Sequence, residues 1–276
     1  MSEQNNKLFF ILFNISNEKC YKLSKLYICI PFSKNNQFMK LDILAIGAHP
    51  DDIEISCCGT ILHHIALGHK VGLLDLTAGE LGTRGDAETR LKEAGAAAKM
   101  IAAEIRENLM MPDGFFEQSK ENMLEIIRKI RQYKPEIVLA NSLSDRHPDH
   151  GRAAKLIADA CFYSGLVKIE TESEGKLQEA WRPKAIYHYI QDYNLEPDFV
   201  FDISNYIERK FEILMAYKSQ FYNPNSNEPE TPISSREFIE FLKSKSCTYG
   251  RAAGFHYAEA FNVSRYIGVK NLFDLL

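Results

Sequence analysis

Two short motifs contain the residue types of a metal-dependent hydrolase. The first, AHPDD, occupies residues 48–52, and the second, HPDH, occupies residues 147–150. Imidazole and carboxylate ligands suit zinc, and a catalytic zinc takes about three protein ligands and keeps one position open for water. The two motifs therefore indicate a divalent metal beside a carboxylate that can act as a general base.

The position of each motif along the chain supports this interpretation. Each follows an apolar stretch of strand length, residues 41–48 and 136–140, and each precedes a pattern of helix length. In an open parallel sheet, the connections from strand to helix gather at the carboxyl edge, where ligands bind. The two motifs can therefore meet in space.

Beyond residue 38, strand-like and helix-like segments alternate. This alternation predicts an α/β fold with a Rossmann-like, mostly parallel sheet flanked by helices, and a mixed C-terminal part. The first strand is not followed by a GxGxxG fingerprint, so NAD is not implied. We expect strands over residues 41–48, 70–76, 136–140, 185–191 and 199–203, and helices over residues 53–67, 87–103, 121–133, 150–163, 207–216 and 237–244.

Several segments resemble the LmbE-like, or PIG-L, family of zinc-dependent N-acetylglucosamine deacetylases. They are AHPDDIE, GELGTRGDAETRLKEA, LANSLSDRHPDHGRAAKL, YKSQFY and YAEAF. Within that family, GELGTRG, DRHPDH and EAWRPKAIYHYIQ are similar to the members of bacillithiol biosynthesis that deacetylate N-acetylglucosaminyl malate. The resemblance begins near Met39 and implies one deacetylase domain over residues 39–276. It also implies a homo-oligomer, a trimer or a hexamer.

The resemblance implies three metal ligands, His49, Asp52 and His150. The metal would be zinc, with Fe²⁺ as a possible replacement in cells.

The resemblance assigns proton transfer to three further residues. Asp51 would be the general base, and His147 would stabilise the oxyanion and protonate the leaving amine, oriented by Asp149. An independent chemical argument supports different roles for Asp51 and Asp52. A carboxylate bound to a cation loses basicity, whereas its unligated neighbour can still accept a proton.

Two arginines are the best candidates for substrate recognition. Arg90 and Arg146 could bind the two carboxylates of a malate aglycone, since the guanidinium fork matches a carboxylate. Glu80, Arg84 and Gln220 are weaker candidates, for sugar hydroxyls or for loop order. Other substrates remain open, such as an inositol glycoside or a chitooligosaccharide, and so does a non-catalytic sugar- or metal-binding protein.

Each motif also has a structural alternative. Asp-Asp after a strand can be a helix N-cap, and HPDH can be an ordinary turn. Cys57 and Cys58 are expected on the apolar face of the first helix, where they pack in the protein core. The remaining histidines are expected at solvated positions: His63, His64, His69, His188 and His256.

Composition limits the class of protein. The 276 residues are 45% hydrophobic and 25% charged, which fits one globular domain or a domain with a small subdomain. A formal charge of −4 gives no electrostatic footprint for nucleic acid. No apolar run approaches the ~18 residues of a membrane span. Six cysteines without CxxC spacing fit a reducing cytoplasm, and the expected partner is a small N-acetylglucosamine conjugate.

Residues 1–38 differ from the rest of the chain. They contain no Ala, Gly, Val, Asp or Arg and are dense in Lys, Asn, Phe and Ile. The apolar run of residues 8–13 is too short for a signal peptide, and no cleavage site of small residues follows it. We expect an atypical extension that is not part of the native protein, with an extra hairpin or oligomer contact as the alternative.

Overall fold

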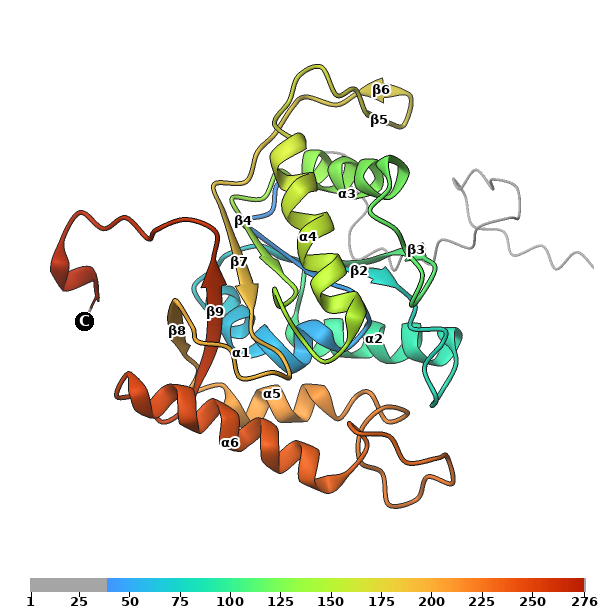
Figure 1. The fold of residues 1–276 in the computed structure, drawn as a ribbon, viewed down its shortest axis with the longest axis vertical. Coiled ribbons are helices and arrows are strands. Elements are labelled where there is room, and N and C mark those ends of the chain that lie inside the picture. The colour runs from blue at the N-terminus through green and yellow to red at the C-terminus, as the bar shows by residue number, and fades with distance from the viewer. Residues whose placement is uncertain (1–38, 276) are drawn as a thin grey trace, which may run out of the picture.

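The computed structural model describes residues 39–275. The prediction about residues 1–38 lies outside the described residues. Seven strands form one sheet flanked by helices on both faces (Figure 1). The strands are β1 (Ile43–Gly47), β2 (Val71–Thr77), β3 (Ile105–Met111), β4 (Ile137–Ala140), β7 (Ala185–Tyr189), β8 (Phe199–Asp202) and β9 (Ala258–Val263), and a separate hairpin pairs β5 (Glu172–Ser173) with β6 (Lys176–Leu177). The helices are α1 (Asp52–Ala66), α2 (Ala87–Ile101), α3 (Lys120–Tyr133), α4 (Pro148–Tyr163), α5 (Ile207–Leu214), α6 (Arg236–Ala252) and the short 3₁₀ helix η2 (Leu272–Leu275).

The strand order confirms the predicted fold class. The order is β3-β2-β1-β4-β7-β9-β8, with parallel pairing from β3 to β7 and antiparallel pairing of β9 with both β7 and β8. The connections from β1 lead to one side of the sheet and those from β4 to the other. This topological switch point opens a crevice at the carboxyl ends of the two strands, and both histidine motifs lie there.

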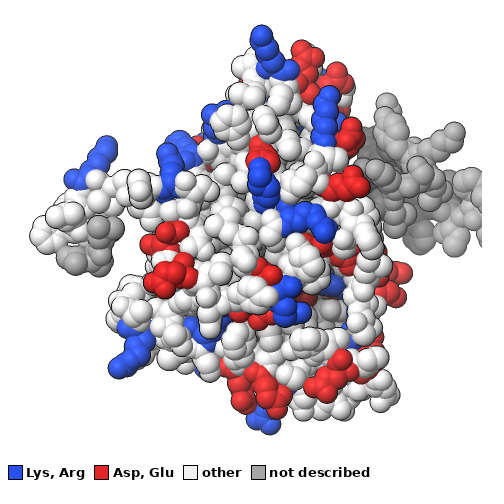
Figure 2. All heavy atoms as spheres, viewed as in Figure 1, with Lys and Arg blue, Asp and Glu red and all other residues white. Residues whose placement is uncertain are grey.

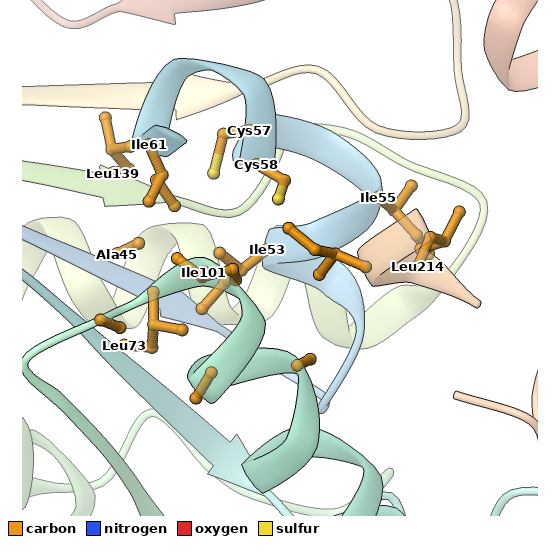
Figure 3. Packing of buried hydrophobic residues seen from close by; sticks show 14 of the residues in the cluster. Ala45, Ile53, Ile55, Cys57, Cys58, Ile61, Leu73, Ile101, Leu139 and Leu214 are labelled. Carbon is orange, nitrogen blue, oxygen red and sulfur yellow. The ribbon is translucent and has the colours of Figure 1, made fainter. Parts of the chain in front are cut away.

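Two apolar cores, one on each face, hold the sheet in place. Side chains alternate along β1, so that Ile43 and Ala45 enter the core under α1, α2 and α5, whereas Leu44 and Ile46 enter the core under α3 and α4. Figure 3 shows the first of these cores, in which Ala45 and other strand residues face α1. The predicted packing of the cysteine pair is confirmed, because Cys57 and Cys58 are fully buried.

Helix α1 is broken in the middle by a buried ion pair. Its backbone leaves helical geometry at Cys57 (φ −137°, ψ 16°). The Glu259 carboxylate of β9 accepts the N–H groups of Gly59 and Thr60 at 2.9 and 2.7 Å and the ammonium of Lys210 at 2.7 Å. The carboxylate therefore caps the second half of the helix, as an N-cap side chain does at a helix start.

Three parts of the fold differ from the prediction. No strand was expected at β3 or β9, because buried charges interrupt the apolar pattern: Arg106 pairs with Asp75 in the first case, and Glu259 binds Lys210 in the second. Helix α6 runs eight residues beyond its predicted end at Ser244. The prediction of a solvated His188 is wrong, since β7 is covered on both faces and the ring is buried against the carbonyl of residue 141.

The surface shows no patch of one charge on the face drawn in Figure 2, where basic and acidic side chains are interspersed. Within residues 39–275, none of the helices has the length and apolar character needed to cross a membrane. The four cysteines in this range are all free: Cys57, Cys58, Cys161 and Cys247.

Removing the cap in α1 should destabilise the protein. Glu259→Ala leaves Lys210 buried without its partner, and we expect a loss of about 3–5 kcal/mol in the free energy of unfolding. Urea denaturation measures this value. Glu240→Ala, which removes an exposed ion pair with Arg236, is the control and should cost less than about 0.5 kcal/mol. Equal losses in the two variants would contradict the role of the buried pair.

Candidate metal and active site

A pocket of about 430 Å³ opens at the carboxyl edge of the sheet. This volume is within the range of small-molecule sites. The predicted site residues meet here although they come from three separate segments. Of the predicted set, only Asp149 does not line the pocket; those that do are His49, Asp51, Asp52, Arg90, Arg146, His147 and His150.

The Asp52 carboxylate is at the centre of the site. Asn141 and Gln191 donate their side-chain amides to its two oxygens at 3.0 and 2.7 Å, and the backbone N–H of His49 donates at 3.0 Å. The His150 ring lies 3.2 Å away. Burial works to raise the pKa of Asp52, but the neighbouring histidines outweigh it and hold this pKa well below its ordinary value. The carboxylate is therefore ionised and fixed in orientation.

Each of the two histidines beside Asp52 has its other ring nitrogen on a carboxylate. Nδ1 of His150 lies 2.5 Å from Asp145, which leaves Nε2 facing Asp52. Nε2 of His49 lies 2.9 Å from Asp113, which leaves Nδ1 at 3.6 Å from Asp52. Metal-binding histidines commonly have this carboxylate on the nitrogen remote from the metal, where it fixes the tautomer and the ring orientation.

The donor set fits a divalent cation. Two imidazole nitrogens face one buried carboxylate, and this combination suits zinc and related metals. The ligand atoms of His147 also lie within 4.8 Å of those of His49 and His150, and a second group of three shares His49. The groups are His49, His147 and His150, and His49, Asp113 and Asp149.

Asp51 differs sharply from its neighbour. Its backbone is in the left-handed region (φ 117°), which is unusual for a residue with a side chain. Its carboxylate accepts Arg90 Nη2 at 3.2 Å, and the same guanidinium donates to the carbonyls of Pro50 and Gly79. Burial raises the pKa of Asp51 to about 7, against the lowering effect of Arg90.

Gly79, in the GELGTRG segment, makes room for this arginine. A Cβ at that position would lie 2.0 Å from Arg90 Nη1, and the glycine has φ +65°. The structure thus directs Arg90 to Asp51, and its contact with an anionic aglycone stays a prediction.

His147 begins α4 as its N-cap. Its Nδ1 accepts the backbone N–H of Asp149 at 3.3 Å, so its Nε2 carries the proton of the neutral ring. Burial and the nearby rings of His49 and His150 lower the pKa of His147. The contact from Asp149 is thus made by its backbone, while its carboxylate accepts Arg152 and the Gly114 N–H.

Of the remaining predicted residues, Arg146 and Gln220 line the pocket, whereas Glu80 and Arg84 do not. Arg146 is about half exposed and donates Nε to Asp192 at 2.5 Å. Arg84 donates to Ser226 of the loop over residues 223–234, and that loop reaches the pocket through Thr231 and Ile233. The weaker candidates therefore order the loops: Gln220 donates to the carbonyl of Arg84, and Glu80 accepts the N–H of Asp113.

Four residues of the site were missed from the sequence. Asp113, Asn141 and Gln191 each lie one or two residues beyond the end of a parallel strand, and Asp145 lies just before HPDH. A polar side chain directly after a predicted strand was the signal available for Asn141, whereas Gln191 was the last residue of a strand predicted over residues 185–191. For Asp113 this signal was hidden, because β3 itself was not expected.

Known proteins are similar to this chain in sequence and in fold. Residues 44–161 match the family model PIG-L: GlcNAc-PI de-N-acetylase. Diacetylchitobiose deacetylase of Thermococcus kodakarensis is 29% identical over 229 residues, which cover 79% of this chain and 80% of that protein. A second relative is the 1D-myo-inositol 2-acetamido-2-deoxy-alpha-D-glucopyranoside deacetylase of Thermobispora bispora. It is 27% identical over 190 residues, which cover 54% of this chain and 59% of that protein.

Among solved structures, a conserved protein of Thermus thermophilus, TT1542, has a TM-score of 0.74 and 32% identity, covering 83% of this chain and 98% of that one. The chain belongs to the PIG-L, or LmbE-like, family of deacetylases.

Loss of one metal ligand should release the metal. His49→Ala, Asp52→Ala and His150→Ala each remove a donor from the predicted three-ligand site, so each variant should lose most of its bound metal, as measured by elemental analysis of the purified protein. His256→Ala, at an exposed position, is the control and should keep it. Full metal content in any two of the three ligand variants would rule out this ligand set.

Proposed function

We propose that this protein is a metal-dependent hydrolase that removes the acetyl group from an N-acetylglucosamine conjugate. One observation carries the proposal. Two histidines backed by carboxylates face Asp52, and a second carboxylate, Asp51, lies next to it with a different environment. A site that only stored a metal or bound a sugar would not need Asp51 and His147.

His49, Asp52 and His150 would hold the metal, which we propose is zinc. When bound there, a zinc ion would polarise the amide carbonyl and lower the pKa of a water. Asn141 and Gln191 fix the Asp52 carboxylate, so its orientation does not depend on the substrate. The protein therefore presents a preorganised ligand set.

Asp51 would accept a proton from the attacking water. Burial raises the pKa of this carboxyl group, and a more basic carboxylate is the better proton acceptor. Arg90 fixes the position of the Asp51 carboxylate. Although Asp51 is the N-cap residue of α1, its side chain makes no capping hydrogen bond, because the left-handed backbone turns it into the pocket.

His147 would donate a hydrogen bond from Nε2. Its Nδ1 accepts a hydrogen bond from the backbone N–H of Asp149 in the first turn of α4, so the neutral ring presents its Nε2–H to the pocket. That donor would stabilise the oxyanion of the tetrahedral intermediate. A neutral imidazole does not give up this N–H, so the proton that Asp51 takes from the water would pass to the leaving amine as the C–N bond breaks, which restores the Asp51 carboxylate.

Asp51→Asn should separate binding from catalysis. The variant should keep its metal, because Asp51 is not in the proposed ligand set, and should lose about 10²–10⁴-fold in turnover, the usual contribution of a general base. Acetate release and elemental analysis measure the two effects. Asp159→Asn, on the surface of α4, is the control. A metal-replete Asp51→Asn enzyme with near wild-type turnover would reject this role.

For the substrate, we propose N-acetylglucosaminyl malate, whose deacetylation supplies a free amine for cysteine attachment in bacillithiol synthesis. Arg146 supports this choice, because it stands at the pocket rim and uses only Nε within the described part of the chain, toward Asp192. Its two terminal nitrogens can meet a carboxylate. Arg90 would support Asp51 in this scheme and contribute to the anion only through its charge.

A chitooligosaccharide is the second candidate, and a different wall of the pocket favours it. Leu81 and Phe115 line the pocket with 60% and 75% of their surfaces exposed. An exposed aromatic ring beside a site can pack against the apolar face of a pyranose ring. The similarity to diacetylchitobiose deacetylase agrees with this alternative.

Charge removal at the rim should decide between these substrates. Arg146→Met should lower kcat/KM for N-acetylglucosaminyl malate by about 1.5–3 kcal/mol in transition-state free energy, the range for a hydrogen bond to a charged group, and should hardly affect diacetylchitobiose. Deacetylation kinetics on both substrates measure this. Phe115→Ala is the converse variant, and Arg182→Met, which lies against Phe162, is the control. Equal losses on both substrates would make Arg146 structural.

A further inference from the structure

A buried lysine of α6 binds one short loop at the edge of the site. Lys245 is 9% exposed, and its ammonium donates to the carbonyls of Gln191, Asp192 and Tyr193 at 2.5, 2.9 and 2.9 Å. Only Ile190 separates these residues from the end of β7. The ammonium therefore uses all three of its donors on consecutive peptide groups.

The opposite side of the same loop is held by a carboxylate. Asp145 accepts the N–H groups of Asp192 and Tyr193 at 3.1 and 3.0 Å through one oxygen. Its other oxygen lies 2.5 Å from Nδ1 of His150. The Lys245 ammonium thus binds the carbonyl groups of residues 191–193, and the Asp145 carboxylate binds the N–H groups of residues 192 and 193.

This loop contacts the site at two further points. Gln191 donates its amide to Asp52, and Asp192 accepts Arg146. From this arrangement, we infer that Lys245 is a positioning residue, which holds residues 191–193 so that Gln191 orients Asp52 and Asp145 orients His150. Through Lys245, helix α6 then helps to orient the proposed metal ligands Asp52 and His150. The inference rests on the proposed function for its catalytic consequence only.

Stability alone does not account for this lysine. Within residues 39–275, Lys245 makes no ion pair with a carboxylate, and burial lowers its pKa to about 8. Taking an ammonium out of water is costly, and apolar residues of similar size often replace buried charges without loss of stability. What a methionine could not supply is three directed hydrogen bonds to the loop.

The test compares Lys245→Met, Lys245→Gln and Lys245→Arg with Lys243→Met, an exposed lysine of the same helix that pairs with Glu208. The full chain is loaded with zinc. Zinc affinity is measured by competition with a chelator, kcat and KM by acetate release, and the midpoint of thermal unfolding in parallel.

Lys245→Met should weaken zinc binding by about 10–100-fold and lower kcat by a similar factor, the usual effect of a residue that orients metal ligands, with KM changed little. Lys245→Arg should recover part of both losses, and Lys243→Met should match the wild type. If Lys245→Met does not fold, Lys245→Gln decides, since its shorter neutral amide cannot reach three carbonyls.

Wild-type zinc affinity and kcat in a folded Met or Gln variant would overturn the inference, whatever the change in thermal stability. If the wild type binds zinc but deacetylates no N-acetyl sugar, the proposed function fails, and the zinc affinities still decide the role of Lys245.

Discussion

The buried carboxylate of Asp52 is the constraint on which the rest of the site depends. A carboxylate in an apolar environment is tolerated only when its oxygens are satisfied. Here the hydrogen-bond donors come from the ends of β1, β4 and β7, and the His150 ring from the start of α4 lies beside them. These segments converge at the switch point of the parallel sheet. The strand order therefore supplies the donors that the buried Asp52 carboxylate needs.

Two adjacent aspartates then acquire different properties. Asp52 faces amide donors and imidazoles and keeps a low pKa, whereas Asp51 is turned away by a left-handed backbone toward a single arginine and has a raised one. Environments that separate the pKa values of neighbouring carboxyl groups are typical of sites with divided acid and base roles. The strain at Asp51 has a structural cause, since Arg90 binds both its side chain and the carbonyl of Pro50.

Two side chains from the C-terminal part of the chain, residues 236–263, stabilise the elements that carry the site. Glu259 of β9 caps the broken helix α1, and Lys245 of α6 binds the loop after β7. Both side chains are charged, buried and hydrogen-bonded to backbone groups of the parallel half. The C-terminal part thus positions the second half of α1 and the Gln191 loop without itself supplying one of the proposed metal ligands.

The sequence by itself determined the α/β class and the position of AHPDD and HPDH at strand ends, because the periodicities of two and 3.6 residues are local properties of the chain. Buried charges in β3, β9 and the end of α6 escaped this reasoning, since a polar residue reads as exposed until its partner is known. Only the tertiary structure decided which polar groups pair. Asp52 and Gln191 are 139 residues apart, and Arg90 and Asp51 are 39 apart. Hydrogen bonds act over about 3 Å, so no spacing along the chain can specify them, and the pairing follows from strand order and helix packing.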